Sequence, residues 1–412
     1  MKYSIKTYGC KLNQSETSDL RRVLSTKFTE APDSEADLIV INSCGVIDKT
    51  ERRVLKKAKE FKKKGKTVVI TGCLPSMTKK VKKVADLTLQ GNDPEDFLRK
   101  ISSIQEMGSL EDDGIPSLRK KGSVSAIIPI STGCLGNCSY CSAKIARGEL
   151  VSYPVEKIKR EVIRNLDRGA KEIQITSQDL SVYGMDTGKP LLVDLIREII
   201  NIERDFKVKL GMMNPGFVDG YFDLFLELFK SDKLYNFLHI PVQSGSDEIL
   251  KKMNRRHNSG DFVKLIEKIR GRYKNFLIST DVIVGFPTES EDDFEETVDL
   301  IKKTRPHIIN ITRYSQRSGT EADQMKDMPS KIKKRRSRRL TKLGKEMRRE
   351  DNQKMVGEEF ETLIFREGKG ETKLGRIFNG KAVVIPEGGP GEKKKVKIVD
   401  FKHNYLIGDV KS

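Results

Sequence analysis

Three cysteines lie close together near the middle of the chain, at Cys134, Cys138 and Cys141. Their C-x3-C-x2-C spacing lets one short loop supply three thiolates to a 4Fe-4S cube, whereas a fully ligated cluster takes four cysteines. One iron would therefore keep an open coordination position. An open position distinguishes a catalytic metal site from a structural one, because substrate must reach the metal. The spacing therefore predicts a loop that performs chemistry.

Two structural interpretations of this loop compete with the catalytic one. A disulfide framework is disfavoured, because we expect a long chain without a signal peptide to occupy a reducing cytosol. Structural zinc normally takes four ligands, and the neighbouring Asn137 and Tyr140 are poor candidates for the fourth. The histidines all lie far downstream, at His239, His257, His307 and His403. An iron-sulfur loop remains the favoured interpretation.

The other three cysteines, Cys10, Cys44 and Cys73, each come just after a predicted strand. In the first hundred residues, β-branched runs at 2–8, 38–41 and 67–71 alternate with helical patterns at 13–24, 49–64 and 78–84. This alternation predicts a parallel sheet flanked by helices, in which the carboxyl ends of the strands line one crevice.

One cysteine after a strand is ordinary core packing, but three of three are harder to explain that way. Each also neighbours Gly or Asn, residues that allow tight backbone around a bulky ligand. The six cysteines then divide into two sets of three with none left over. This division favours two clusters, each with an open iron.

The bulk composition limits the class of protein. At 412 residues the chain should form two or three domains, and 36% hydrophobic with 33% charged residues is typical of a globular protein with a charged surface. Its apolar runs are far shorter than a membrane span, so we expect no membrane association and a cytoplasmic location. A net charge of +19 favours an anionic partner, nucleic acid ahead of membrane. Lys and Glu enrichment in thermophiles is an alternative source of that charge.

A second run of strands and helices follows a Gly- and Pro-containing stretch near residues 101–122. Its strands are expected at 126–130, 172–176, 208–212, 237–242, 276–284 and 307–312, with helical patterns at 154–168, 191–204 and 290–303 between them. In barrels built from such units, catalytic groups lie where strands end. The predicted ends are polar, at residues 177–179, 243–246, 285–289 and 313–317.

The C-terminal part begins with a basic run. From residue 331 to 350 it holds eleven Lys or Arg against two Glu, a net charge of +9, on a predicted helix. Such a run is often only a solvated helix face. Five short strands with Gly turns follow, at 359–365, 372–378, 382–385, 394–401 and 405–410, and predict a small all-β module. Because β-barrels beside basic helices often bind nucleic acid, this part is expected to bind nucleic-acid phosphates, with Arg335, Arg336, Arg338 and Arg339 as contacts.

Together these features resemble the radical S-adenosylmethionine (SAM) methylthiotransferases over essentially the full length. The motifs that carry the resemblance are the three-cysteine N-terminal domain, the C-x3-C-x2-C loop with Tyr140 before its last cysteine, and residues 241–246, 253–255 and 281–287. The resemblance implies a flavodoxin-like parallel α/β domain with an auxiliary cluster at 1–105 and a linker at 106–122. It further implies a partial (β/α)6 radical SAM barrel with a basic helical extension at 123–350 and a TRAM-like β module at 351–412.

Within that family, residues 176–184 and 314–320 are similar to the archaeal and eukaryotic branch that acts on N6-threonylcarbamoyladenosine in tRNA. Gln178 departs from that pattern, because relatives more often carry an acidic residue there. Three other activities remain as alternatives: methylthiolation of isopentenyladenosine in tRNA, methylthiolation of a ribosomal protein side chain, and RNA binding by a non-enzymatic iron-sulfur protein. A basic C-terminal module argues against a protein substrate, and an open-iron loop would be unnecessary without catalysis.

The resemblance also implies the mechanism and the cofactors, two 4Fe-4S clusters and SAM. The cluster on Cys134, Cys138 and Cys141 would generate a deoxyadenosyl radical that removes hydrogen from C2 of the purine, since an unactivated aromatic C–H has no acidic proton for a general base. The cluster on the other three cysteines would supply the methylthio group, with its sulfur from a species bound at the open iron and its methyl from a second SAM, and an electron donor is a further partner. The expected SAM contacts are Tyr140 at the adenine, Asp179 and Gln243 at the amino group and ribose, Arg255 at the carboxylate, and Ser177, Gln178 and Ser244.

Overall fold

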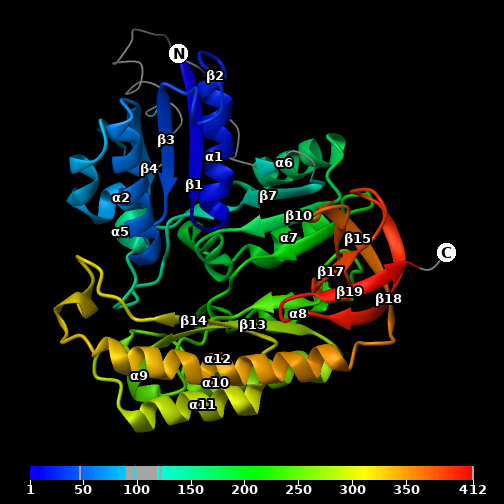
Figure 1. The fold of residues 1–412 in the computed structure, drawn as a ribbon. Helices are drawn as coiled ribbons and strands as arrows, with labels where there is room; N and C mark the ends of the chain where they lie inside the picture. The colour runs from blue at the N-terminus through cyan, green and yellow to red at the C-terminus, as the bar shows by residue number, and fades with distance from the viewer. Residues whose placement is uncertain (46–47, 90–96, 98–117, 120–122, 411–412) are drawn as a thin grey trace. The chain divides into compact units, whose positions relative to one another are not determined.

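The computed structural model describes residues 1–45, 48–89, 97, 118–119 and 123–410. The linker expected at 106–122 lies outside the described residues except for 118–119, which form the short strand β6 (Leu118–Arg119). The chain divides into two compact units. Unit 1 comprises 1–118, 127–161 and 315–324, and unit 2 comprises 119–126, 162–314 and 325–412. Figure 1 shows the elements of both.

Unit 1 is built on a five-stranded parallel sheet. Its strands are β1 (Lys2–Tyr8), β2 (Thr29–Glu30), β3 (Leu38–Ser43), β4 (Thr67–Gly72) and β5 (Leu87–Thr88). They lie in the order β2-β1-β3-β4-β5, and each neighbouring pair is parallel. This 2-1-3-4-5 order is that of flavodoxin, so the predicted flavodoxin-like sheet is confirmed. The two-residue edge strands β2 and β5 were not predicted.

Helices cover both faces of this sheet because consecutive strand residues point to opposite sides. On one face Ile39 packs with Val54 of α2 (Asp48–Lys63), and on the other Val40 packs with Leu20 of α1 (Lys11–Leu24) (Figure 1). The helix expected at 78–84 forms a 3-10 turn, η1 (Lys79–Lys83), after the short helix α3 (Leu74–Met77). The unit also contains β8 (Ser131–Thr132), α5 (Ala143–Arg147), β9 (Val151–Ser152) and η6 (Glu321–Gln324).

The six strands predicted for the central region are all present. They are β7 (Ser125–Pro129), β10 (Glu172–Thr176), β11 (Lys207–Leu210), β12 (Phe237–His239), β13 (Leu277–Val284) and β14 (Ile308–Arg313). In unit 2, β10 and β11 pair in parallel, β12, β13 and β14 form a parallel sheet, and a bridge between Met212 and His239 joins the two groups. Successive parallel strands separated by helices fit the predicted barrel-like arrangement.

The helices between these strands are α6 (Val155–Asp167), α7 (Leu192–Ile200), α8 (Phe222–Glu227), α9 (Asp247–Lys252), α10 (Ser259–Arg272) and α11 (Glu291–Thr304), and α12 (Ser330–Gln353) follows β14. Figure 1 shows α10, α11 and α12 layered beside β13 and β14. Two of them begin with a capping box, Asn258 with Asp261 on α10 and Ser290 with Asp293 on α11. Among the described residues, no helix is both long and apolar enough to span a bilayer.

The C-terminal module is a closed barrel, as predicted from its five short strands. Strands β15 (Glu359–Glu367), β16 (Lys373–Arg376), β17 (Ala382–Ile385), β18 (Lys393–Phe401) and β19 (Leu406–Val410) close in the order β15-β16-β17-β19-β18. The module is fastened within unit 2 by Arg376, whose Nε donates to Glu172 Oε2 at 2.8 Å. Glu172 is fully buried at the start of β10, where it also accepts from Ser125 Oγ and Tyr235 Oη.

Candidate functional site

The C-x3-C-x2-C loop of unit 1 is held closed at its base. Strand β8 pairs with β9 in antiparallel fashion, so the residues between them form a compact loop. Gly133 allows the chain to close there: its φ is +72°, and a Cβ at this position would lie 1.8 Å from the carbonyl oxygen of Glu149. The backbone N–H of Cys134 donates to the carbonyl of Gly148 at 3.3 Å. Backbone contacts therefore close the loop at its base.

The sulfurs of this loop face backbone donors. The N–H of Gly136 donates to Cys134 Sγ at 3.3 Å, and the N–H of Ala143 donates to Cys141 Sγ at 3.4 Å. A side chain at Gly136 would approach Cys134 Sγ and Cys138 Sγ, at 3.5 and 3.9 Å, so its absence keeps the space between them open. Backbone N–H groups favour the anionic thiolate. This donor set fits a 4Fe-4S cluster with three protein ligands.

The second set of cysteines follows the ends of three adjacent strands of unit 1. Tyr8 is paired with Ser43, and Ser43 with Gly72, so β1, β3 and β4 end level with one another. Cys44 and Cys73 follow directly on β3 and β4, and Cys10 comes two residues after β1 at the start of α1. The carboxyl ends of parallel strands therefore bring the three thiols to one edge, as predicted.

These thiols differ in exposure: Cys44 and Cys73 are buried, whereas Cys10 is exposed. The Cys10 thiol donates to Asn13 Oδ1 at 3.3 Å, and buried Asn13 is in turn bonded to Asn42. Among the described residues, no three His, Cys, Asp or Glu side chains are grouped to hold one metal ion. The thiolates of a cubane each bind a different iron, so that finding concerns mononuclear sites such as zinc.

Arg147 contacts the candidate site, and sequence reasoning missed it. It ends α5, just after the C-x3-C-x2-C loop, and its Nε donates to Cys73 Sγ of the other set at 3.1 Å. Its two terminal nitrogens bind Glu16 of α1, and the two side chains are only 5% and 8% exposed. Burial raises the pKa of the Cys73 thiol to about 11, and the Arg147 guanidinium opposes that rise. Nothing in a single sequence pairs residues this far apart along the chain.

The expected SAM contacts are divided between the units. Tyr140 is half-buried in the cysteine loop of unit 1, and the remaining candidates belong to unit 2, all in segments that follow strands except Arg255, which follows α9. Three of these, Ser177 Oγ, Gln178 Oε1 and Gln243 Oε1, are buried without a hydrogen-bond partner in the described part of the chain. Buried polar atoms without partners are costly and uncommon in proteins. Oxygens of this kind fit the amine and hydroxyl donors of a polar ligand such as SAM.

Gln243 is also held in an unusual backbone conformation, with φ of +73°. This region is strained for a residue with a side chain, and such strain clusters at functional sites. The backbone is fixed on both sides by β13, because the Gln243 N–H donates to the carbonyl of Asp281 and its own carbonyl accepts from the N–H of Ile283. The strand therefore stabilises a conformation that the loop alone would avoid.

The other three candidates make internal contacts. Asp179 is 3% exposed, burial raises its pKa, and its Oδ1 accepts from the N–H groups of Ser181 and Asn214. Arg255 is partly buried, and its Nη2 donates to Asn214 Oδ1 at 2.8 Å and to the carbonyl of Pro241 at 3.1 Å. Ser244 Oγ lies 3.3 Å from the hydroxyl of Thr297. Asn214 thus links Asp179 with Arg255 between two strand ends.

A polar row across β12, β13 and β14 was also missed from the sequence. His239 Nε2 lies 2.8 Å from Asp281 Oδ1, which accepts from Asn310 Nδ2 at 2.8 Å as well. The side chains of His239 and Asp281 are 23% and 31% exposed, so solvent or ligand can reach them. A single sequence gives no signal that sets these three apart, because β13 and β14 carry other polar residues as well.

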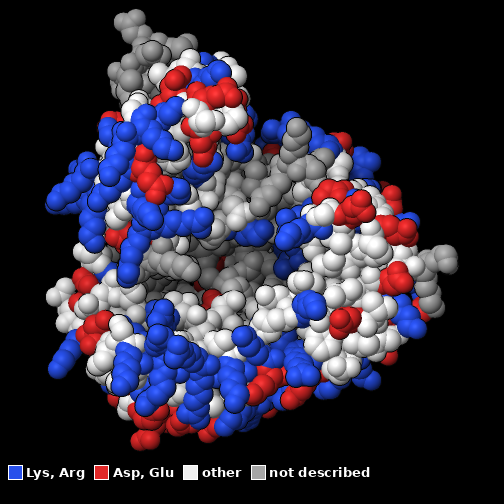
Figure 2. Space-filling model, viewed as in Figure 1, with Lys and Arg blue, Asp and Glu red and all other residues white. Residues whose placement is uncertain are grey.

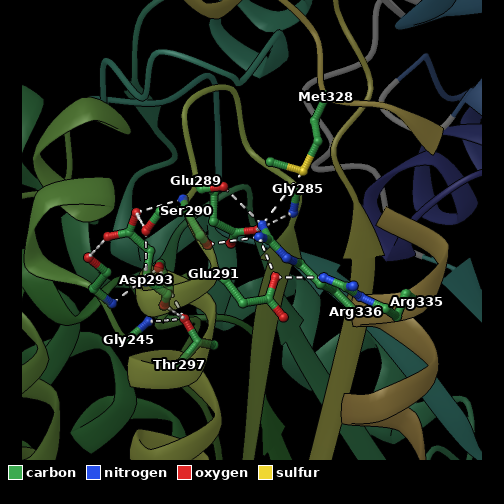
Figure 3. A network of polar contacts seen from close by, with 12 residues as sticks. Gly245, Gly285, Glu289, Ser290, Glu291, Asp293, Thr297, Met328, Arg335 and Arg336 are labelled. Atoms are coloured by element: carbon green, nitrogen blue, oxygen red, sulfur yellow. Dashed lines mark hydrogen bonds and ion pairs between the residues drawn. The ribbon is translucent and has the colours of Figure 1, made fainter. Parts of the chain in front are cut away.

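Figure 3 shows how α12 is fastened to the loop that follows β13. Glu289 Oε2 accepts from the N–H of Gly285 at 2.7 Å and from Arg336 Nη1, and Arg336 Nη2 donates to the carbonyl of Ser290 and to Glu291. The side chains of Arg336 and Glu289 are 3% and 1% exposed. Arg336 was expected to contact RNA phosphate, and that expectation is wrong, because the residue is buried in this network.

Comparison with known proteins agrees with this architecture. Residues 2–89 match the Uncharacterized protein family UPF0004, residues 128–301 match the Radical SAM superfamily, and residues 353–411 match the TRAM domain. The solved structure of the radical S-adenosylmethionine methyltransferase TsrM from Kitasatospora setae superposes with a TM-score of 0.59 at 11% identity, over 78% of this chain and 75% of that one. At that identity the likeness concerns the fold alone.

Two relatives extend over most or all of the chain. A protein of Archaeoglobus fulgidus named "Probable threonylcarbamoyladenosine tRNA methylthiotransferase" is 42% identical over 100% of this chain and 99% of its own length. The Danio rerio protein named "Threonylcarbamoyladenosine tRNA methylthiotransferase" is 33% identical over 88% of this chain and 69% of its own. These matches confirm the resemblance drawn from the motifs: the chain belongs to the threonylcarbamoyladenosine tRNA methylthiotransferase family of radical SAM proteins.

Proposed function

We propose that the protein converts N6-threonylcarbamoyladenosine in tRNA to its 2-methylthio derivative. The observation that carries the proposal is the division of six free cysteines into two sets of three within one compact unit. One set lies on a backbone-closed loop and the other at three level strand ends. Two three-thiol sites in a tRNA methylthiotransferase family support one cluster for hydrogen abstraction and one for sulfur delivery.

The cofactors follow from the family and from the donor sets. Membership of the radical SAM superfamily implies a 4Fe-4S cluster and SAM; the second cluster, on Cys10, Cys44 and Cys73, is part of the proposal. When bound, these groups supply one-electron chemistry that removes hydrogen from an unactivated C–H bond and delivers a methylthio group. A sulfur species and an electron donor are the further partners that this stoichiometry requires. A tRNA substrate also favours a cytoplasmic location.

The residues of the chain would hold and orient these groups. Backbone N–H groups of Gly136 and Ala143 stabilise the thiolates of the loop, and the unpartnered oxygens of Ser177, Gln178 and Gln243 accept the hydrogen bonds that position SAM. Precise orientation matters because the reacting atoms must be close before the chemical step. The chain fixes these donors and acceptors in advance through strand ends.

RNA binding is assigned to the outward face of α12 and to the β module. Figure 2 shows Lys and Arg side chains gathered over α12. Five of its exposed cations have no ion-pair partner among the described residues: Lys331, Lys334, Arg338, Lys345 and Arg349. Unpaired exposed cations are what the phosphate backbone of RNA requires. Of the four arginines expected from the sequence, this set keeps Arg338; Arg336 is buried, and Arg335 and Arg339 are exposed but paired with Glu291 and Glu295.

The experiment is anaerobic reconstitution followed by iron and sulfide counts, with mass spectrometry of tRNA nucleosides after reaction. The full chain should hold about eight irons as two cubes, and replacing Cys134, Cys138 and Cys141 with Ala should leave about four. The intact protein should form the 2-methylthio nucleoside, and both triple-cysteine variants should form none. If the variant that lacks Cys134, Cys138 and Cys141 held no iron, the division into two sites would be contradicted. If the intact protein held its full iron content and still left the nucleoside unmodified, the substrate assignment would be contradicted.

A further inference from the structure

Unit 2 contains a cavity of about 430 Å³ between β14, helix α12 and the C-terminal barrel. Its wall includes Phe237, Leu277 and Ile308, the first residues of β12, β13 and β14. The cavity therefore opens at the start of these strands, whereas the SAM candidates with unpartnered oxygens, Ser177, Gln178 and Gln243, follow the ends of β10 and β12. With about 3.3 Å per residue, the eight residues of β13 separate the two ends by roughly 25 Å. The cavity is distinct from the proposed catalytic site.

The polar part of the wall is cationic. Lys345, Arg348 and Lys381 line the cavity with His307 and His403, and none of its described lining residues is Asp or Glu. Cationic clefts with low-dielectric walls concentrate anions. The apolar part of the wall belongs to strands, which hold the cavity open without a ligand.

The three cations make no ion pair with a carboxylate in the described part of the chain. Arg348 Nε donates to the carbonyl of His307 at 3.2 Å, and its Nη1 donates to Asn404 Oδ1 at 2.6 Å. The Lys381 ammonium contacts the thioether sulfur of Met355 at 3.6 Å, and Lys345 is exposed. By contrast, the guanidinium of Arg376, also in the wall, is paired with Glu172. The cavity thus keeps three cationic side chains that form no described ion pair with a carboxylate.

Burial makes these charges costly. It lowers the pKa of Lys381 to about 8, despite the field of Asp351, and it lowers the pKa of Arg348 as well. It lowers the pKa of His307 to about 4, so that ring contributes no charge near neutral pH. A bound anion would offset the desolvation of the ammonium and guanidinium groups.

We propose that this cavity binds a phosphate group of the RNA backbone through Arg348, Lys381 and Lys345. The inference rests on the proposed function, since it assumes tRNA as the partner. RNA is favoured over a free anion because Lys345 also belongs to the exposed cationic face of α12, so the cavity continues the surface assigned to RNA. The β-barrel on its other side is of a kind that often binds nucleic acid. The site would hold RNA at a point remote from the reacting nucleoside.

The test compares tRNA affinity across salt concentrations for the full chain and for the double variant Arg348→Gln/Lys381→Gln. Each neutralised phosphate adds slightly less than one unit to the log-log slope, so the variant should lose about one unit and bind roughly tenfold more weakly. The matched control is Lys264→Gln/Lys303→Gln, which removes two exposed cations of α10 and α11 away from the cavity and should leave the slope unchanged. Because Arg348 also supports the fold, Lys345→Gln and the charge-preserving Arg348→Lys are measured alongside. Lys345→Gln should weaken binding, and Arg348→Lys should keep the slope.

Three outcomes are decisive. An unchanged slope in both Arg348→Gln/Lys381→Gln and Lys345→Gln overturns the inference. Calorimetry with inorganic phosphate separates the sources: phosphate binding that the double variant loses, with an unchanged RNA slope, identifies a site for a free anion and also overturns it. A slope that falls only in the cavity variants supports it. These measurements detect binding and do not require catalysis. The absence of a 2-methylthio product would therefore count against the proposed function without deciding this inference.

Discussion

Replacing Arg336 with Gln should destabilise unit 2 strongly while leaving RNA contacts unaltered. The change leaves the Glu289 carboxylate in a site where its side chain is 1% exposed, with the N–H of Gly285 as its remaining donor among the contacts described above. Removing one partner of a buried ion pair costs about 3–5 kcal/mol, because the other charge stays buried without compensation. Arg336 also donates to the carbonyls of Glu289 and Ser290, so two further hydrogen bonds are lost.

The loss should appear in thermal unfolding followed by circular dichroism. For a unit of about 150–250 residues, 1 kcal/mol corresponds to roughly 2–4 °C, so Arg336→Gln should lower the midpoint by about 6–20 °C. The double variant Arg336→Met/Glu289→Gln removes both charges and should recover most of the difference, since apolar or neutral replacements of a buried pair are often tolerated.

Arg338 provides the matched control, because it lies two residues away on the same helix, exposed and without an ion-pair partner in the described residues. Arg338→Gln should change stability by no more than about 0.5 kcal/mol and should flatten the salt dependence of tRNA binding by slightly less than one unit. If Arg336→Gln unfolds at the temperature of the Arg338 variant and reduces the salt slope instead, the division of α12 into an anchoring face and a binding face is refuted.

Three other predictions test the remaining contacts. Arg147→Met should destabilise unit 1 by about 3–5 kcal/mol, since it removes the buried cation that pairs with Glu16, and denaturant unfolding measures it; a loss below about 1 kcal/mol would show that the pair is not desolvated. Replacing the three N-terminal cysteines should spare SAM cleavage and abolish methylthio product, and loss of cleavage in a folded variant would contradict that separation of roles. Burial raises the pKa of Glu172, but Arg376 and the neighbouring hydrogen-bond donors lower it by more, so the pKa is lower in the folded protein than in the unfolded chain. The ionised carboxylate therefore stabilises the fold fully above the unfolded pKa, and this stabilisation is lost as the pH falls through the folded pKa. The wild type should therefore lose more stability than Glu172→Gln below about pH 4 in pH-dependent unfolding, and parallel curves would contradict this assignment.

Much of the fold could be predicted because it rests on periodicity. Each predicted strand consists of at least four residues with a β-branched or apolar pattern, and all of them are present. The two-residue strands β2 and β5 are too short to show any period, and they pair with β1 and β4 because the sheet edge is there to receive them. The level strand ends that gather Cys10, Cys44 and Cys73 followed from topology, which a parallel order dictates.

The contacts that could not be predicted join residues far apart in the chain. Arg147 and Glu16 are 131 positions apart, and each alone reads as an ordinary charged residue. On α12 the difficulty was different: Lys333, Arg336, Leu340 and Met347 share a buried face at helical spacing, but two of the four are cationic and disguise the stripe. A prediction from charge alone therefore made the RNA-binding surface of α12 too large, because the sequence does not show which cations are buried and which are exposed.

The starts of these strands are assigned to RNA binding and their ends to SAM binding, and steady-state kinetics can separate these two roles. A strand is rigid, so RNA held at the start of β13 lies at a fixed distance from the loop that follows its end. Variants of the cavity, such as Lys345→Gln, should therefore raise the RNA concentration needed for half-maximal rate and leave the rate at saturating RNA unchanged. Gln243→Ala should lower the saturated rate instead, because the oxygen without a protein partner and the strained backbone lie on the side assigned to SAM. If Lys345→Gln lowered the saturated rate and left RNA affinity unchanged, the cavity would act in the chemical step. The proposal that RNA binds at the start of β13 while catalysis takes place beyond its end would then be refuted.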